Sequence, residues 1–187
     1  MKPIHNIPTS SPLNRAKAKV TIVTALAIGA AMLALVLFWI VTFTLEDIET
    51  IFLTLGLILL MAGIIALVKR GHIKLGAWIL TGLMIFLNLS NMTWYGVSTT
   101  SSAGYLIPIL LALFGIGSGA GLGVAILGCV SVFAISGLAS TGQIQTEIPY
   151  AESHLTFDAP ALTLIYLVVY FISNAWVKSA QEIFAEK

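Results

Sequence analysis

The chain has 187 residues, of which 58% are hydrophobic and only 9% are charged, and its net charge is +1. A soluble domain carries about 25% charged residues, so this composition excludes most cytosolic enzymes and intrinsically disordered chains. The near-neutral charge also excludes a surface for nucleic acids. The single cysteine, Cys129, excludes an internal disulfide bond. We therefore predict an all-α, polytopic integral membrane protein.

Six segments are apolar enough to be membrane spans, for which roughly 20 residues are needed. They are predicted at residues 20–43, 51–68, 75–95, 102–116, 119–140 and 159–177, the fourth being short. The implied organisation is a flexible cytoplasmic tail (1–19), a six-helix transmembrane bundle (20–177) with an outer loop (140–160), and a cytoplasmic helical extension (178–187).

The charged residues divide between the two sides of this predicted bundle. All nine basic residues lie before the first span, between the second and third, or after the sixth: Lys2, Arg15, Lys17, Lys19, Lys69, Arg70, Lys74, Lys178 and Lys187. Six of the eight acids lie in two connections on the opposite side: Glu46, Asp47, Glu49, Glu147, Glu152 and Asp158. The positive-inside rule then predicts that both termini are cytoplasmic.

None of the six predicted spans contains Asp, Glu, Lys, Arg or His. Ionisable groups inside the membrane mark proton relays and transport pathways, so their absence argues against a pump or proton-coupled carrier. The three histidines, His5, His72 and His154, lie outside the spans and cannot hold a haem in the bilayer. No motif of an intramembrane protease is present. We expect a protein that is not an enzyme, without cofactor or metal.

Uncharged polar side chains do occur within the spans. Their spacings of three and four residues place Asn88 with Asn91, and Tyr166 with Tyr170 and Asn174, on common helix faces. Hydrogen bonds between neighbouring helices are the favoured interpretation. The alternative is a small-ligand pocket in the outer half of the bundle. Its residues would be Asn88, Asn91, Trp94 and Tyr105.

Glycines alternate through residues 115–123, and residues 115–120 formally fit the dinucleotide-binding pattern G-x-G-x-x-A. That interpretation needs a preceding strand and an acid about 20 residues later. Apolar spans flank this segment instead, and the first acid after it is Glu147. We predict a tight cytoplasmic turn, with Gly115, Gly119 and Gly123 permitting close helix packing.

The outer loop and the C-terminal segment are the other informative parts. Glu147, Glu152, His154 and Asp158 match no known metal-binding spacing, and the apolar residues among them predict a loop folded onto the mouth of the bundle. After Trp176 the sequence lacks Gly and Pro and favours a helix that continues into the cytoplasm. Whether that helix joins a dimeric coiled coil or ends on the headgroups stays open.

From Lys69 onward, the chain resembles a known family in three segments: RGHIKLGAWILTGLMIF, SAGYLIPILLALFGIGSGAGLG and AWVKSAQEIFAE. The chain resembles the six-span membrane sensor modules at the N-termini of bacterial histidine kinases of Chloroflexota type. In that family the last helix leads into a cytoplasmic output domain. No such domain follows Lys187, so phosphotransfer is not implied.

The resemblance implies a non-enzymatic sensor module that passes a rearrangement of the bundle to a partner through the last helix. An accessory subunit of an electron-transfer or photosynthetic membrane complex is the alternative, and a small-solute channel or carrier is the weakest hypothesis. The expected partners are the lipid bilayer and a cytoplasmic or membrane protein, with homodimerisation left open, and no nucleic acid.

Overall fold

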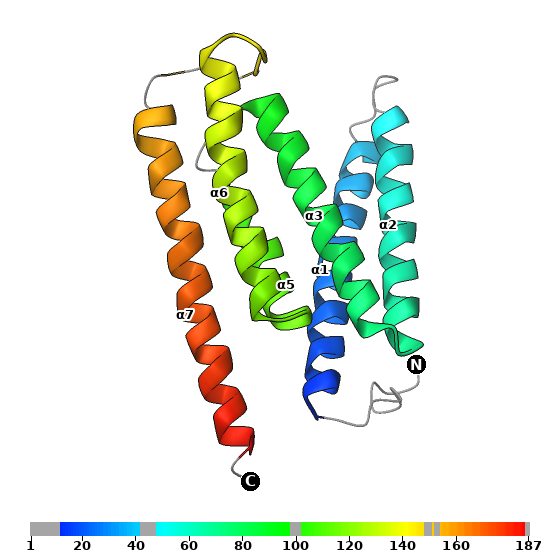
Figure 1. The fold of residues 1–187 in the computed structure, drawn as a ribbon. Coiled ribbons are helices and arrows are strands. Elements are labelled where there is room, and N and C mark those ends of the chain that lie inside the picture. The colour runs from blue at the N-terminus through cyan, green and yellow to red at the C-terminus, as the bar shows by residue number, and fades with distance from the viewer. Residues whose placement is uncertain (1–11, 42–47, 98–101, 148–150, 152–153, 186–187) are drawn as a thin grey trace. The chain divides into compact units, whose positions relative to one another are not determined.

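The computed structural model is all-helical, and it describes residues 12–41, 48–97, 102–147, 151 and 154–185 (Figure 1). The chain divides into two compact units, Met1–Leu80 and Thr81–Lys187. The helices are α1 (Pro12–Val41), α2 (Ile48–Lys69), α3 (Ile73–Tyr95), α5 (Leu106–Gly115), α6 (Ser118–Ser140) and α7 (Ala159–Ala185). Helix α3 begins in the first unit and ends in the second. All of these helices except α5 are long and apolar enough to cross a membrane, as expected of a multi-pass membrane protein.

The first unit is built on the pairing of α1 with α2. Small side chains of α1, including Ala18 and Ala25, are fully buried, and Met61 and Ile64 of α2 are buried almost as completely. A Cβ atom at Gly29 would lie 3.8 Å from Met61 Cβ, which is ordinary van der Waals contact. Small residues therefore let the two helices approach closely, as is common in membrane helix pairs.

Helix α1 begins earlier than the sequence predicts. The predicted flexible tail covers residues 1–19, but residues from Pro12 onward are helical, so that part of the prediction was wrong. Proline suits the first position of a helix because its φ angle is preset and its missing N–H would have no partner there. The following Ala16, Lys17, Ala18 and Lys19 are good helix formers that extend the apolar helix toward its N-terminus.

The second unit packs α6 against both α5 and α7, and α5 also contacts α7. Its buried core includes Met92 of α3, Tyr105, Ile109 of α5, Val132 of α6 and Tyr166 of α7. In Figure 1, α6 and α7 run as long neighbouring helices of opposite direction. The core of this unit therefore combines aliphatic side chains with two fully buried tyrosines.

Helix α5 is much shorter than a membrane span. Its 10 residues measure about 15 Å, whereas the hydrocarbon core is about 30 Å thick. Pro108 in its first turn explains why α5 begins only at Leu106, because proline cannot donate to the carbonyl of Gly104 and would clash with it in a longer helix. Tighter turns precede it instead, with Tyr105 N–H donating to Ser102 O at 3.0 Å and Ile107 N–H to Gly104 O at 3.3 Å. The predicted fourth span is thus helical at residues 102–103 and 106–115, with a turn at Gly104 and Tyr105 between the two parts.

The connections at the two ends of α6 differ. Gly117 joins α5 to α6 with φ +155°, a conformation that L side chains rarely adopt. At the other end, a loop follows Ser140, and Glu147 N–H donates to Trp94 O at 2.9 Å. Ile144 of the same loop packs against the buried core. The loop is therefore attached to the end of α3, and the predicted loop residues 148–150 and Glu152 lie outside the described residues.

Helix α7 is preceded by a short π-helical segment, His154–Asp158, and then runs for 27 residues. Its length of about 40 Å exceeds the thickness of the hydrocarbon core. The helix continues without a break from Ala159 to Ala185. Most of the predicted extension 178–187 is thus the last part of the same helix that packs on α6.

Candidate functional site

The candidate site is a cluster of polar side chains buried in the second unit, between the start of α5, the middle of α6 and α7. We call it the tyrosine cluster. Its members are Asn88, Ser102, Gly104, Tyr105, Gly128, Ser131 and Tyr166. Tyr105 enters the core at a two-residue turn, Gly104 and Tyr105, which separates the helical residues 102–103 from α5. Such a break in a helix is tolerated at membrane depth only where protein or water surrounds it.

The two tyrosines carry the long-range hydrogen bonds of the cluster. Tyr105 and Tyr166 are both fully buried, and their ring centroids are 5.8 Å apart with the planes inclined at 38°. The Tyr166 hydroxyl donates to Ser102 O at 2.6 Å. The Tyr105 hydroxyl lies 3.2 Å from Ser131 Oγ, and the Ser131 hydroxyl donates to Leu127 O at 2.7 Å. A serine hydroxyl has one proton, and that of Ser131 is already donated to Leu127 O. The Tyr105 hydroxyl is therefore the donor in its bond with Ser131 Oγ.

Gly128 of α6 makes room for both rings. A Cβ atom at this position would lie 2.9 Å from Tyr105 Cδ1 and 3.2 Å from two ring carbons of Tyr166. Contacts under 3.0 Å require something to move, and two packed aromatic rings in a close-packed interior have little freedom to do so. The absence of a side chain at residue 128 therefore determines how closely the two tyrosines approach α6.

Asn88 of α3 is the polar residue that lies against Gly104, in the turn before α5. Its side chain is 7% exposed, and its Nδ2 donates to Met84 O at 2.7 Å. Its Oδ1 lies so close to Gly104 that a Cβ atom there would overlap it. Asn88 and Tyr105 are therefore brought into the same region, with Gly104 lying between the amide of Asn88 and the start of α5.

Three buried hydroxyls close to these residues along their elements have no hydrogen-bond partner among the described residues. They are Ser102 Oγ, Ser136 Oγ and Thr163 Oγ1. Ser136 lies five residues after Ser131 on α6, and Thr163 lies three residues before Tyr166 on α7. An unpaired buried polar group costs about 1–3 kcal/mol. The second unit therefore holds more hydrogen-bonding capacity than its own side chains use.

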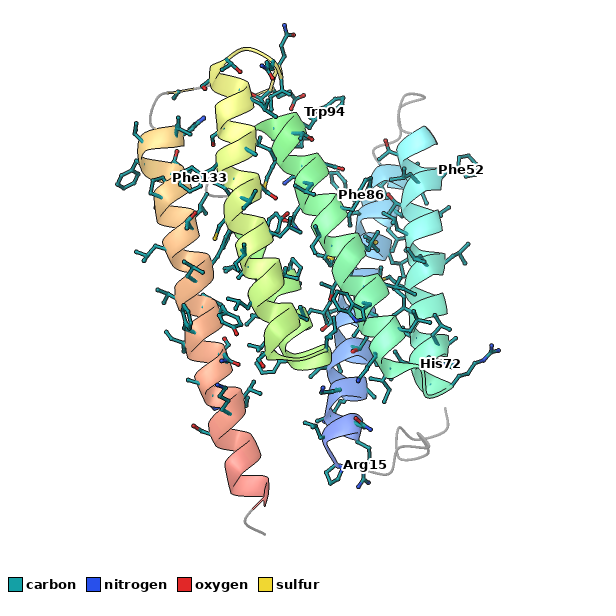
Figure 2. All side chains as sticks on the ribbon, viewed as in Figure 1. Arg15, Phe52, His72, Phe86, Trp94 and Phe133 are labelled. Carbon is teal, nitrogen blue, oxygen red and sulfur yellow. The ribbon has the colours of Figure 1, made fainter. Side chains whose placement is uncertain are left out.

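The structure brings together only part of the predicted ligand pocket. Asn88 and Tyr105 are buried and meet at Gly104, and Asn91 is half-buried. Trp94 is 66% exposed at the end of α3 and does not belong to the tyrosine cluster (Figure 2). An exposed tryptophan at a helix end matches the ordinary role of a headgroup anchor.

Of the three residues of α7 that were predicted to support helix packing, two bond to neighbouring segments and, among the described residues, one does not. Tyr166 and Tyr170 face the rest of the unit, and the Tyr170 hydroxyl donates to Ser118 O at 3.2 Å. Asn174 is half-buried, and its Oδ1 has no partner among the described residues. Both tyrosines therefore connect α7 to neighbouring segments of the second unit.

The glycines at which two helices approach closely are not the ones predicted from the spacing of four residues. Gly115 is buried, but a Cβ atom at Gly119 or Gly123 would have no atom within 4 Å. Gly121 fills that role instead, since its Cβ would lie 2.9 Å from Leu113 Cβ. Residues 121 and 128 are seven apart and therefore lie on the same face of α6. The turn after α5 orients α6 so that this face packs against the rest of the second unit.

Sequence reasoning missed Ser102, Gly128 and Ser131 as members of the cluster. Gly128 and Ser131 are three residues apart in an otherwise apolar helix, a pattern of small residues that marks helix interfaces in membranes. That signal was available, but it does not say which aromatic side chain occupies the gap. The pairing depends on where α5 begins.

The chemistry available to the tyrosine cluster is neutral hydrogen bonding. Its groups are two phenols, serine hydroxyls, one amide and backbone carbonyls, and it contains no carboxylate, imidazole, ammonium or guanidinium group. In the described part of the chain, no group of three or more His, Cys, Asp or Glu residues is placed to hold a metal ion. The arrangement suits the recognition of an uncharged polar molecule, or a switch between alternative hydrogen-bond partners.

Comparison with known proteins found no family model, no curated protein and no solved structure that matches this chain.

Proposed function

We propose that the protein is a non-enzymatic membrane sensor module in which α7 carries a rearrangement of the tyrosine cluster to a partner protein. The observation that supports this most directly is the continuity of α7. One uninterrupted helix bears Tyr166 in the buried cluster, Tyr170 on Ser118, and the segment up to Ala185. A displacement at the cluster would move the far end of that helix.

The hydrogen bonds of the cluster suit a two-state element. Tyr166 donates to the backbone carbonyl of Ser102, just before the turn at Gly104, and the hydroxyls of Ser136 on α6 and Thr163 on α7 have no partner among the described residues. Exchanging one acceptor for another costs little when spare partners are available, so two arrangements can lie close in free energy. A stimulus that binds one arrangement better would shift the population toward it.

The proposed orientation places both termini in the cytoplasm of a bacterial cell, with the protein in the inner membrane. It rests on the distribution of the basic residues, which all fall before or at the start of α1, around the α2–α3 turn, or at the end of α7 and just after it. In this orientation, the last turns of α7 are available to a cytoplasmic partner or to a second copy of the chain.

The experiment measures whether the cluster and the end of α7 are coupled. Spin labels are placed at residues 118 and 178, both exposed and both in the second unit, in a Cys129→Ala background. Electron–electron distance distributions are then compared for protein with Tyr166 and with Tyr166→Phe, in liposomes. We expect the variant to redistribute the 118–178 distances, because the hydrogen bond to Ser102 O is lost.

The matched control is Tyr95→Phe, because Tyr95 is 45% exposed at the end of α3. It should leave the distances unchanged. Identical distributions for all three proteins would contradict relay through α7. Purification in fixed stoichiometry with a pigment or redox complex would favour the accessory-subunit hypothesis instead.

A further inference from the structure

Cationic side chains gather at one end of the first unit. They come from three elements: Arg15, Lys17 and Lys19 on α1, Lys69 and Arg70 at the end of α2, and Lys74 in the first turn of α3. All except the half-buried Lys17 are exposed. No acidic residue occurs in residues 12–41 or 51–80, so no carboxylate of these segments offsets the charge. Figure 2 shows Arg15 and His72 at this same end of the unit.

The turn between α2 and α3 holds several of these cations close together. Gly71 adopts φ +96°, and Arg70 N–H donates to Ala66 O at 3.0 Å, so the chain reverses within a few residues. A Cβ atom at Gly76 would lie 2.5 Å from Val68 Cγ2, which shows how tightly the two helices meet. Lys17 of α1 is within electrostatic range of Lys74. The tertiary fold thus brings a cationic side chain of α1 close to the cationic side chains of the α2–α3 turn.

The surface next to these cations is apolar and aromatic. Leu75 is 50% exposed and Trp78 is 52% exposed. Trp78 follows Lys74 by four residues, so the ammonium group and the indole share one face of α3. Tryptophan is enriched at the level of lipid headgroups, where its ring is apolar and its N–H meets water. A cation with an apolar surface directly beside it matches a molecule that has an anionic head and hydrocarbon tails.

We propose that the turn between α2 and α3, together with Lys17, forms a binding site for the phosphate of an anionic phospholipid. Lys69, Arg70 and Lys74 surround the headgroup, and Leu75 and Trp78 contact the start of its acyl chains. Arginine can form two parallel hydrogen bonds with phosphate, and lysine supplies a compact charge. The exposed apolar face favours a lipid over a free phosphate ion, which has no hydrocarbon to bury.

The test counts lipids retained by the full chain. Purified protein in a neutral detergent is titrated with phosphatidylglycerol or with phosphatidylcholine, and bound lipid is measured by native mass spectrometry. The triple variant Lys69→Gln, Arg70→Gln, Lys74→Gln is compared with Lys178→Gln, which removes one exposed cation from the second unit. Far-UV circular dichroism and elution volume check that each protein is folded.

We expect the wild-type chain to prefer phosphatidylglycerol. Each surface cation contributes about a fivefold gain in affinity for an anionic lipid, so the triple variant should lose on the order of a hundredfold at low ionic strength. Lys178→Gln should bind as the wild type does, and Lys69→Arg with Lys74→Arg should retain the preference. Equal binding by the triple variant would overturn the proposal. Displacement of the lipid by inorganic phosphate, but not by chloride at equal ionic strength, would show a free-anion site instead.

Discussion

The two units bury polar side chains in different ways. In the first unit, the Thr21 hydroxyl donates to Lys17 O at 3.0 Å and the Thr54 hydroxyl to Thr50 O at 2.8 Å, each within its own helix. In the second unit, the Tyr166 hydroxyl reaches a carbonyl 64 residues away, and the hydroxyl of Tyr170 one 52 residues away. The two buried threonines of the described first unit bond within their own helices, whereas the second unit has, besides such local bonds, hydroxyls that join separate segments of the chain.

Hydrogen bonds within one helix and hydrogen bonds between segments constrain the positions of the helices differently. A hydroxyl that bonds to its own helix is satisfied wherever that helix goes, so it places no constraint on the neighbouring helix. A hydroxyl that bonds to another segment links the position of two elements and breaks when they move apart. The second unit is therefore the part in which a change of helix position changes hydrogen bonding, whereas the bonds of Thr21 and Thr54 in the first unit do not depend on the neighbouring helix.

The largest expected effect is that of Gly128→Val, which places a branched side chain against both tyrosine rings. Overpacking a close-packed interior costs about 1–3 kcal/mol, and we expect the upper end because both rings are buried. Unfolding in a mild detergent by added dodecyl sulfate, followed by tyrosine fluorescence, measures the free energy. Gly123→Val on the same helix is the control, since a Cβ atom there meets nothing within 4 Å. Equal losses for the two variants would contradict the packing described for Gly128.

The contrast between Gly128 and Gly123 also shows how far sequence reasoning extends. The absence of charge and the lengths of the apolar segments predict the helices well: α6 was expected at 119–140 and is observed at Ser118–Ser140. The inward face of α6 is harder to predict, because an almost wholly apolar helix has little amphipathic signal. Which glycine is close to a neighbour then depends on the turn at Gly117 and on the rotation that it imposes.

The tyrosine cluster was predicted only in part for a related reason. Asn88, Tyr105 and Tyr166 stand out in the sequence as polar groups within spans, but the predicted pocket joined Tyr105 to Trp94 and assigned Tyr166 to helix packing. The physical cause is the interruption before α5. Pro108 cannot donate to the Gly104 carbonyl, the helix is interrupted by a turn at Gly104 and Tyr105, and Tyr105 lies beside Tyr166.

A smaller effect is expected for Tyr166→Phe, which keeps the ring and removes only the hydroxyl. Hydrogen bonds between membrane helices contribute about 0.6 kcal/mol on average and about 1.7 kcal/mol at most. The 2.6 Å bond to Ser102 O is short and fully buried, so we expect a loss in the upper part of this range, about 1–1.7 kcal/mol, in the same dodecyl sulfate titration. Tyr95→Phe should change the free energy by less than about 0.5 kcal/mol, because exposed positions contribute little. A Tyr166→Phe protein as stable as the wild type would mean that another partner replaces Ser102 O.

The smallest expected effect is that of Thr54→Val in the first unit. The substitution removes a buried hydroxyl but also removes its need for a partner, since the Thr50 carbonyl keeps its own bond within α2. Valine has nearly the same shape as threonine, so the packing against α1 is retained. We expect a change within about 0.5 kcal/mol of zero, because a bond inside one helix adds little to tertiary stability. A loss as large as that of Tyr166→Phe would show that the hydroxyls of the first unit also hold separate helices together, and the distinction between the two units would fail.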